Sequence, residues 1–238
     1  MSELASPPTR RREFLAGCRD EAPILLGVVP FGMIYGLVAV GAGLSAFTAQ
    51  AMSSVVFAGS AQFIAAQLIH EGAPAAAVVL TVFLVNLRHA LYSASVAPHV
   101  KHLGATWKGI LAYLLTDEAY AVAISRYHRD GQRGEVSPHR HWYFLGAGLA
   151  LWATWQWSTA LGVFFGARVP QSWSLDFALP LTFIALVFPS LKDRAGSASV
   201  LSAGVLAVLA AGLPYKLGLM LAAAAGIAVG LAVEKETA

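Results

Sequence analysis

Between Ala22 and His70 the chain contains no aspartate, glutamate, lysine or arginine. In a typical soluble domain about a quarter of the residues are charged, whereas charged residues make up only 12% of this chain and hydrophobic residues make up 57%. Uninterrupted apolar sequence of this length predicts helices that cross a lipid bilayer. We therefore expect an all-α, polytopic transmembrane helical bundle. The chain has a net charge of +3. Its arginines cluster in loops and tails and form no basic patch with interleaved aromatic residues, so nucleic acid is not an expected partner.

Charges, prolines and glycines divide the apolar sequence into about eight expected spans. Seven spans are the alternative, because Pro214 separates the last two segments and this pair could form one span with a re-entrant piece. Residues 1–21 are expected to form a tail, 22–233 a single transmembrane transport domain, and 234–238 a second tail. At about 1.5 Å per residue, most segments are long enough for a hydrocarbon core of about 30 Å. The expected spans are 22–43, 46–69, 73–98, 108–125, 141–165, 175–190, 198–212 and 214–233.

Lysine and arginine indicate the orientation, because loops on the cytoplasmic side of a membrane are enriched in them. With eight spans and the N-terminus inside, most of these residues lie on the inner side, including those of the main cytoplasmic loop, 126–140. The outer side then holds Lys101, Lys108, Arg168 and Lys216. The sequence therefore predicts that both termini are cytoplasmic.

Charged side chains also occur in the middle of two expected spans. Arg88 lies near the midpoint of the third span, and Asp117 and Glu118 lie near the midpoint of the fourth. An arginine at the bilayer centre costs about 2.5–3.5 kcal/mol on insertion scales, so we expect it to pair with a carboxylate at the same depth. Two carboxylates against one guanidinium leave a surplus negative charge. Either one carboxyl is protonated, or His89 is charged, or a cation or substrate ammonium completes the balance.

Proline and glycine fall near the centres of the first two spans, within 29–32 and 57–62. Both residues weaken the helical hydrogen-bond ladder, and free backbone groups in a membrane are tolerated only against protein or a water-filled cavity. Secondary transporters build substrate sites from such broken helices. We therefore expect broken helices near the bilayer midplane. The candidate residues of a substrate or ion pathway are Asn86, Arg88, His89, Asp117, Glu118, Gly59, Ser60, Gln62, Pro30 and Gly32.

Other motifs have structural interpretations. Gly32 and Gly36 in the first span, and Gly162 and Gly166 in the fifth, have the GxxxG spacing of closely packed helices. The mid-span charges could also form a buried ion pair that only fixes helix packing. No metal site is expected, since no cysteine or carboxylate supports the histidines at 139–141. Neither HExxH nor GxSxG occurs in the sequence, so an enzyme is not expected.

Six motifs spread along the chain resemble the AzlC family, the large subunits of two-component exporters for branched-chain amino acids. They are VPFG at 29–32, FAGSAQF at 57–63, NLRHALYSAS at 86–95, TDEAYAV at 116–122, LPLTF at 179–183 and PYKLGL at 214–219. The resemblance implies a multi-pass permease of the bacterial inner membrane without a cofactor. It also implies a small hydrophobic AzlD-type membrane subunit as partner, and efflux of leucine, isoleucine, valine or similar apolar amino acids.

The mid-span residues fit such a substrate. A zwitterionic amino acid needs a partner for each charged end: Arg88, or amides freed near Gly59 and Gly32, for the carboxylate, and Asp117 or Glu118 for the ammonium. A titratable group at mid-depth would also allow proton coupling. The alternatives are a channel or membrane scaffold with a structural charge cluster, and an intramembrane enzyme. Exchange of labelled substrate across a membrane separates a transporter from all of these.

Overall fold

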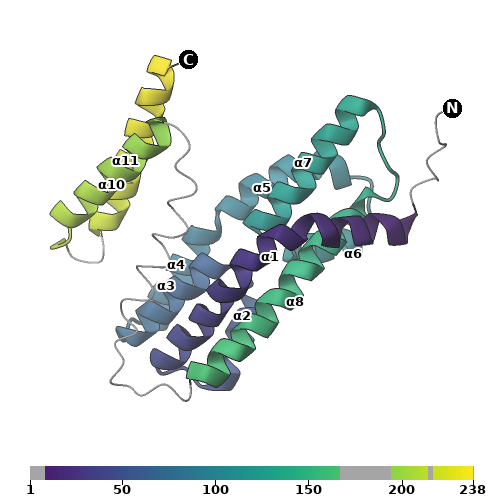
Figure 1. The fold of residues 1–238 in the computed structure, drawn as a ribbon. Helices are drawn as coiled ribbons and strands as arrows, with labels where there is room; N and C mark the ends of the chain where they lie inside the picture. The colour runs from purple at the N-terminus through teal and green to yellow at the C-terminus, as the bar shows by residue number, and fades with distance from the viewer. Residues whose placement is uncertain (1–8, 167–193, 214–216, 238) are drawn as a thin grey trace. The chain divides into compact units, whose positions relative to one another are not determined.

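The computed structural model describes residues 9–166, 194–213 and 217–237 (Figure 1). All regular structure in these ranges is α-helical, as the sequence predicts. The chain divides into two compact units, Met1–Leu179 and Pro180–Ala238. The expected sixth span, 175–190, and Pro214 lie outside the described residues.

Helices α1 (Arg10–Gly41) and α8 (Arg140–Gly166) lie side by side and parallel in the first unit. Gly17 near the start of α1 faces the backbone of Tyr143, and Gly36 near its end faces Thr159 and Val163. A Cβ on Gly36 would lie 2.6 Å from the Val163 nitrogen, so only glycine allows this approach. The predicted close packing is confirmed, because the two GxxxG motifs pack against one another.

The second expected span, 46–69, does not cross the unit. It consists of α2 (Ala46–Val55), a break at 56–58, and α3 (Gly59–His70). Gly59 lies against the ring of Phe31, and Phe63 packs on both Phe31 and Tyr35. Helix α3 therefore starts at mid-length of α1 and runs toward the end of the bundle where α1 ends, which we call the Gly41 end. Since α2 starts from that same end, α2 and α3 form a hairpin.

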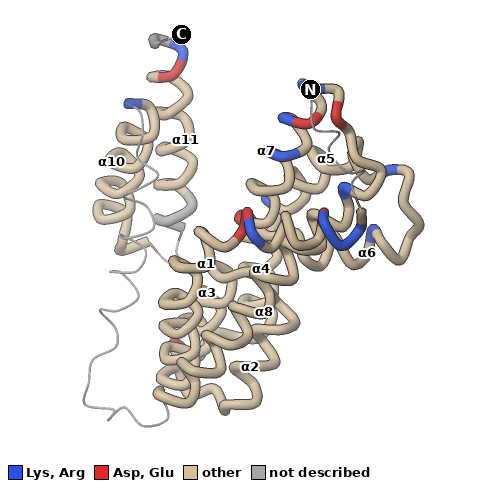
Figure 2. The backbone as a smooth tube through the Cα atoms, turned by 45° about the vertical axis from the view of Figure 1, so that its right-hand side comes forward, with Lys and Arg blue, Asp and Glu red and all other residues tan. Residues whose placement is uncertain are grey.

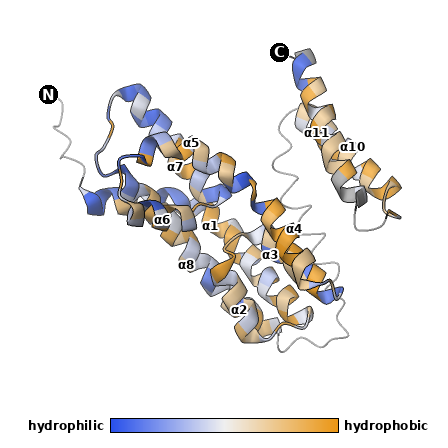
Figure 3. Cartoon of the chain, turned by 180° about the vertical axis from the view of Figure 1, so that it is seen from behind, coloured by the Kyte–Doolittle hydropathy of each residue, from blue (hydrophilic) through white to orange (hydrophobic). Residues whose placement is uncertain are grey.

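The third expected span does cross the unit. It comprises α4 (Ala75–Asn86) and α5 (Arg88–Val100), which meet at Leu87. Helix α4 packs beside α3, and α5 packs beside α7 (Asp117–Arg133). The Ala75–Val100 helix and α1 are the two described helices long and apolar enough to span a membrane. Figure 3 shows that α4 is strongly hydrophobic. Its apolar side chains are nevertheless largely exposed, with Val79 68% and Phe83 60% accessible.

The fourth expected span is a second hairpin, which enters from the opposite end. It consists of α6 (Ala105–Tyr113), a break at 114–116, and α7. Trp107 at the start of α6 contacts Trp142, and Tyr113 at its end bonds to Trp152. Helix α6 thus runs from the start of α8 to its middle. Helix α7 then returns, and Tyr127 donates a hydrogen bond to the Arg140 carbonyl.

The predicted sidedness of the loops is therefore wrong between 46 and 125. We call the end of the bundle where α1 begins the Arg10 end. The turn at 101–104 lies at this end, because His99 contacts Tyr127 and Arg140 and because Trp107 packs on Trp142. Lys101 and Lys108 consequently lie at the same end as the 126–140 loop rather than opposite to it. Figure 2 shows that most basic residues of the first unit are gathered there, and none near the turns beside α2.

The two hairpins have the same build, which the sequence did not reveal as a repeat. A crossing helix precedes each of them, and each is broken over three residues, 56–58 and 114–116. Fully buried alanines with the same spacing follow each break. They are Ala61 and Ala65 on α3, and Ala119 and Ala123 on α7. One crossing followed by one hairpin thus occurs twice, in opposite directions.

The second unit contains α10 (Arg194–Leu209) and α11 (Leu217–Thr237), which pack as an antiparallel pair. Gly218 faces Ala210, and Gly226 and Gly230 both face Ser199. These glycines allow close approach of the two helices. The pair corresponds to the expected spans 198–212 and 214–233.

Candidate functional site

Arg88 occupies the meeting point of three helix starts. It is the first residue of α5, and its Nη1 lies 2.7 Å from Oδ2 of Asp117, the first residue of α7. Its Nη2 donates a hydrogen bond of 2.7 Å to Oγ of Ser60, the second residue of α3. The sequence left open which carboxylate pairs with the arginine, and the structure selects Asp117. One side chain thus links both hairpins to the crossing helix.

Each of these helix starts presents backbone amides. The first turn of a helix has N–H groups without intrahelical acceptors, and the helix dipole adds partial positive charge there. Among the three, Thr116 caps α7 by accepting from the Ala119 amide, whereas α3 and α5 begin without a side-chain cap within the described residues. The starts of α3 and α5 therefore place backbone amides and partial positive charge beside Arg88.

Several polar atoms at this point are buried without a hydrogen-bond partner among the described residues. Nε of Arg88 is a donor, and Oδ1 of Asn86 and Oδ1 of Asp117 are acceptors. The Arg88 and Asp117 side chains as a whole remain 33% and 38% exposed, although these three atoms are themselves buried. Unpaired buried polar groups are costly, and these three would be satisfied by a ligand that carries one acceptor group and one donor group.

The chain around Arg88 also positions its neighbours. His89 Nδ1 lies 3.1 Å from the Asn86 carbonyl, across the α4–α5 break. Tyr92, one turn further along α5, stacks on Tyr120 of α7 with ring centroids 4.6 Å apart. Tyr120 donates a hydrogen bond to Ser95. These contacts join α5 to α7 for more than one turn, so the ion pair sits between two helices that are fixed to each other.

A second link joins the hairpins at the ends of their first helices. Tyr113, the last residue of α6, donates a hydrogen bond of 2.6 Å to the carbonyl of Ser54 on α2. The Trp152 indole on α8 donates to the same tyrosine oxygen. Gln156 of α8 accepts from Ser54 and Gln50. The two breaks are thereby held together from both sides, by Arg88 and by Tyr113.

The family model of the AzlC protein matches residues 23–169, which cover most of α1 and everything through α8. The chain belongs to the AzlC family. It is 28% identical to an inner membrane protein, YgaZ, of Escherichia coli, over 81% of this chain and 79% of that one. It is 30% identical to an uncharacterized membrane protein of Archaeoglobus fulgidus, over 82% and 83% of the two chains. It is also 28% identical to the branched-chain amino acid transport protein AzlC of Bacillus subtilis, over 69% and 62%. No solved structure gives a significant match.

The part of the chain matched by the AzlC model includes both hairpins and the Arg88 site. Gly59 and Ser60, predicted for this site, lie at the start of α3. Glu118 follows Asp117 on α7 and is half-buried. The structure thus brings six of the predicted residues to one place in this AzlC chain. They are Asn86, Arg88, His89, Asp117, Gly59 and Ser60.

Three predicted residues have other surroundings in this AzlC chain. Gln62 is fully buried, and its Nε2 donates to the Met52 carbonyl inside the first hairpin. Gly32 packs against Ser158 of α8. Pro30 is exposed on α1, which remains a continuous helix from Arg10 to Gly41. The expected break of the first helix is therefore absent from the described residues, although Figure 1 shows that α1 changes direction along its length.

Glu21 is not among the site residues that the sequence predicts. It precedes the apolar run and so falls in the expected N-terminal tail, but α1 already begins at Arg10. Its side chain is 0% exposed, and neither carboxylate oxygen has a hydrogen-bond partner in the described part of the chain. Spacing gave a usable signal: Gly17, Glu21 and Val28 fall on one helical face, and all three are buried.

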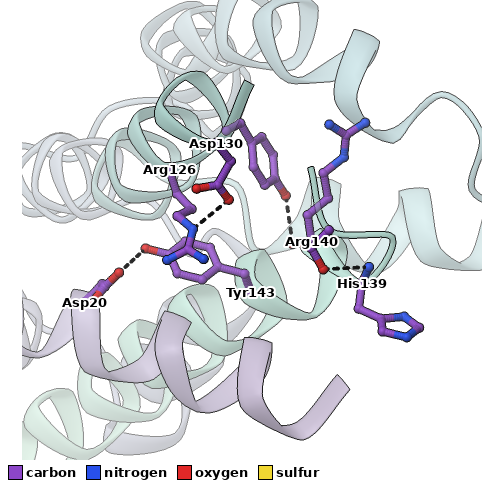
Figure 4. Close-up of polar contacts among 8 residues, drawn as sticks. Asp20, Arg126, Asp130, His139, Arg140 and Tyr143 are labelled. Carbon is purple, nitrogen blue, oxygen red and sulfur yellow. Dashed lines mark hydrogen bonds and ion pairs between the residues drawn. The ribbon is translucent and has the colours of Figure 1, made fainter. Parts of the chain in front are cut away.

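The Arg10 end is closed by a separate polar cluster (Figure 4). Tyr143 of α8 donates a hydrogen bond of 2.7 Å to Asp20 of α1, and Arg126 pairs with Asp130 at 2.7 Å on α7. The Arg126 guanidinium also lies over the Tyr143 ring, 5.4 Å from its centroid. Burial raises the pKa of Tyr127, so this phenol stays a neutral donor at physiological pH. The cluster fixes α1, α7 and α8 to one another.

Proposed function

We propose that this chain is the large subunit of an inner-membrane secondary transporter that exports branched-chain or related apolar amino acids. Membership of the AzlC family and the name of the Bacillus subtilis relative, a branched-chain amino acid transport protein, support this class of substrate. The substrate site in this proposal is the point where α3, α5 and α7 begin.

One observation carries the proposal: the unused hydrogen-bonding capacity around Arg88 matches a zwitterion. The substrate carboxylate binds Nε of Arg88 and the uncapped start of α3, because helix N-termini favour anions. The substrate ammonium donates to Oδ1 of Asp117 and Oδ1 of Asn86. Both charged ends of an amino acid are thus satisfied by groups that lie within one turn of a helix end.

The site stands between two hairpins that enter from opposite ends of the bundle, which supports alternating access. Movement of α2–α3 against α6–α7 would open the site to one side and then to the other. Arg88 and Tyr113 connect the hairpins in the present conformation. If substrate replaced some of these hydrogen-bond and ion-pair partners, its binding would change the relative position of the hairpins.

The distribution of charge supports a cytoplasmic N-terminus. Among residues 9–166, most lysines and arginines lie at the Arg10 end or in the loops that join helices there. The turns at the Gly41 end, 42–45 and 71–74, contain none. Positive charge is retained on the cytoplasmic side during insertion. The Arg10 end is accordingly cytoplasmic, and the Gly41 end faces the periplasm.

The proposed assembly includes a small hydrophobic AzlD-type membrane subunit, as the family resemblance implies. Co-purification after co-expression tests this partnership. The full complex is expected to transport, whereas this chain alone is expected to transport poorly. Full exchange activity of this chain alone would contradict the need for a partner.

Counterflow in proteoliposomes tests the function itself. Vesicles that contain the complex are loaded with unlabelled leucine, and uptake of labelled leucine is followed after dilution. A transporter shows transient accumulation that depends on internal leucine, and glutamate serves as the control substrate. A channel gives uptake without this trans-stimulation, and a scaffold gives none, so either result would sink the proposal.

A further inference from the structure

We propose that the Arg10 end carries a binding site for the phosphate headgroup of an anionic phospholipid, at the point where α1, α6 and α8 begin. The site consists of five side chains that we call the aromatic–basic cluster. They are Arg10, Trp107, His139, His141 and Trp142. This inference is separate from the Arg88 site and does not rest on the proposed transport function.

Ring contacts join the members of the aromatic–basic cluster across the three helices. The Arg10 guanidinium lies over the Trp142 ring, 6.0 Å from its centroid. Trp142 of α8 contacts Trp107 of α6 with ring centroids 5.0 Å apart, and Trp107 contacts His141 at 4.8 Å. His139, just before α8, lies with its ring 6.4 Å from that of His141. One arginine and two histidines are thus gathered around two indoles.

The polar groups of the cluster have capacity for an anion. Arg10 is exposed and forms no ion pair among the described residues, and Nδ1 of His141 is buried without a hydrogen-bond partner in the same part of the chain. Of the acidic residues at this end, Asp20 and Asp130 have other partners, and Glu13 is only 5% exposed. A phosphate suits these groups, because the planar fork of a guanidinium matches its oxygens and a histidine N–H can donate to them.

The level of the cluster along the helices corresponds to a membrane interface. Apolar sequence begins directly after Lys108 on α6 and at Trp142 on α8, and indole rings are enriched where hydrocarbon meets headgroups. On α1 the apolar sequence begins only at Ala22, yet the contact with Trp142 brings Arg10 to the same level. The cluster therefore lies where lipid phosphates lie, and basic pockets between helices at this level bind anionic headgroups.

Exposed apolar side chains continue from the cluster toward the middle of the bundle. Ile110 follows Trp107 by three positions and Leu149 follows Trp142 by seven, so each lies on the same helical face as its indole. Their side chains are 41% and 37% exposed, which offers an acyl chain a path along α6 and α8. A soluble phosphate would gain nothing from these residues, so a phospholipid is the ligand that the whole surface fits.

The test uses the full chain, purified in a neutral detergent and titrated with dioleoyl phosphatidylglycerol. Native mass spectrometry should show a single retained lipid, and the thermal transition should rise until that site is filled. Dioleoyl phosphatidylcholine, which carries no net charge, should do neither at the same concentrations. Glycerophosphoglycerol, the headgroup without acyl chains, should also fail. Equal binding of phosphatidylcholine, or saturation of the site by the soluble headgroup, would overturn the assignment to an anionic lipid.

Three variants locate the site. Arg10→Gln should weaken phosphatidylglycerol binding about tenfold, the effect of losing one charge-assisted hydrogen bond. Arg11→Gln is the matched control, because it removes the same charge from the next exposed position, outside the cluster, and should bind like wild type. His141→Phe keeps an aromatic ring against Trp107 but removes Nδ1, and should also weaken binding about tenfold.

Two results would overturn the site itself. Equal losses in Arg10→Gln and Arg11→Gln would mean that only diffuse charge attraction holds the lipid. Wild-type binding by both Arg10→Gln and His141→Phe would mean that the lipid binds elsewhere. Because none of these measurements follows transport, their outcome is independent of leucine exchange and of the proposed function.

Discussion

The guanidinium of Arg88 and the carboxylate of Asp117 lie 2.7 Å apart, and each residue is the first of its helix. The other terminal nitrogen of Arg88 donates a hydrogen bond to Ser60. Ser60 is the second residue of α3, which runs in the opposite direction to α5 and α7. The ion pair and this hydrogen bond consequently tie together two hairpins that enter from opposite ends. A change in any of the three side chains should affect both hairpins.

Arg88→Lys should insert and express but transport far less. Lysine keeps the positive charge but loses the planar fork that serves Asp117, Ser60 and the substrate simultaneously. Loss of even one charge-assisted hydrogen bond, at about 1.5–3 kcal/mol, predicts at least a tenfold fall in leucine counterflow normalised to protein amount. Arg88→Ala is a harsher comparison, because it leaves a carboxylate without its partner and should also lower the yield of folded protein.

Asp117→Asn should reduce counterflow to a similar degree. The amide keeps the size of the side chain but removes the charge that balances Arg88, and it replaces one of the two acceptor oxygens by an NH2 donor that repels a substrate ammonium. Ser60→Ala is the matched comparison, since it removes one bond to Arg88 but neither charge, and should lose less activity. If Arg88→Lys and Asp117→Asn both exchange leucine like wild type, the charge cluster is structural, and the substrate site must lie elsewhere.

Gly36→Ala should destabilise the protein. A Cβ at this position would collide with the backbone of Thr159 and Val163, which cannot rotate away. Overpacking of this kind costs about 1–3 kcal/mol and should lower the thermal transition of the purified complex. Gly27→Ala on the same helix is the control, because its Cβ would meet nothing within 4 Å. Equal transition temperatures for the two variants would contradict the close contact between α1 and α8.

Single cysteines introduced into Cys18→Ala protein should report the hairpin topology. We expect Glu71→Cys to react with a membrane-impermeant maleimide in intact cells, because the turn between α3 and α4 lies at the Gly41 end. Lys101→Cys should react only after permeabilisation, as should a cysteine replacing Gly134. A model with two additional crossings predicts the reverse for positions 71 and 101. The pattern of labelling therefore distinguishes hairpins from complete spans.

The all-helical architecture and the polar mid-section could be read from the sequence, since apolar length and isolated charges carry that information directly. The partnership of Arg88 with a carboxylate followed from their equal depth. The direction of the second and fourth segments could not be read. Both are long enough to cross, and tertiary contacts such as those of Phe63 with Tyr35 and of Trp107 with Trp142 show that each folds back.

Glu21 and Pro30 illustrate the opposite kinds of error. Glu21 falls in the expected tail because the start of the apolar sequence indicates where a helix enters the lipid, not where the helix begins. Helix α1 starts at Arg10, well before that point. Pro30 was expected to break its helix, because a proline removes one backbone bond. The glycines of α1 pack so closely on α8 that the helix continues through it. Tertiary contact, which a single sequence does not contain, decided both cases.

The breaks in the two hairpins, 56–58 and 114–116, also affect the order in which the protein can be assembled during synthesis. The break at 56–58 leaves the ribosome before Arg88 and well before Asp117, yet irregular backbone cannot remain exposed to lipid. We expect the insertion machinery or a polar pocket to cover the break at 56–58 until the second hairpin, α6–α7, has inserted from the other side. We therefore expect insertion to pass through an incomplete intermediate that becomes stable only once α6 and α7 have been made.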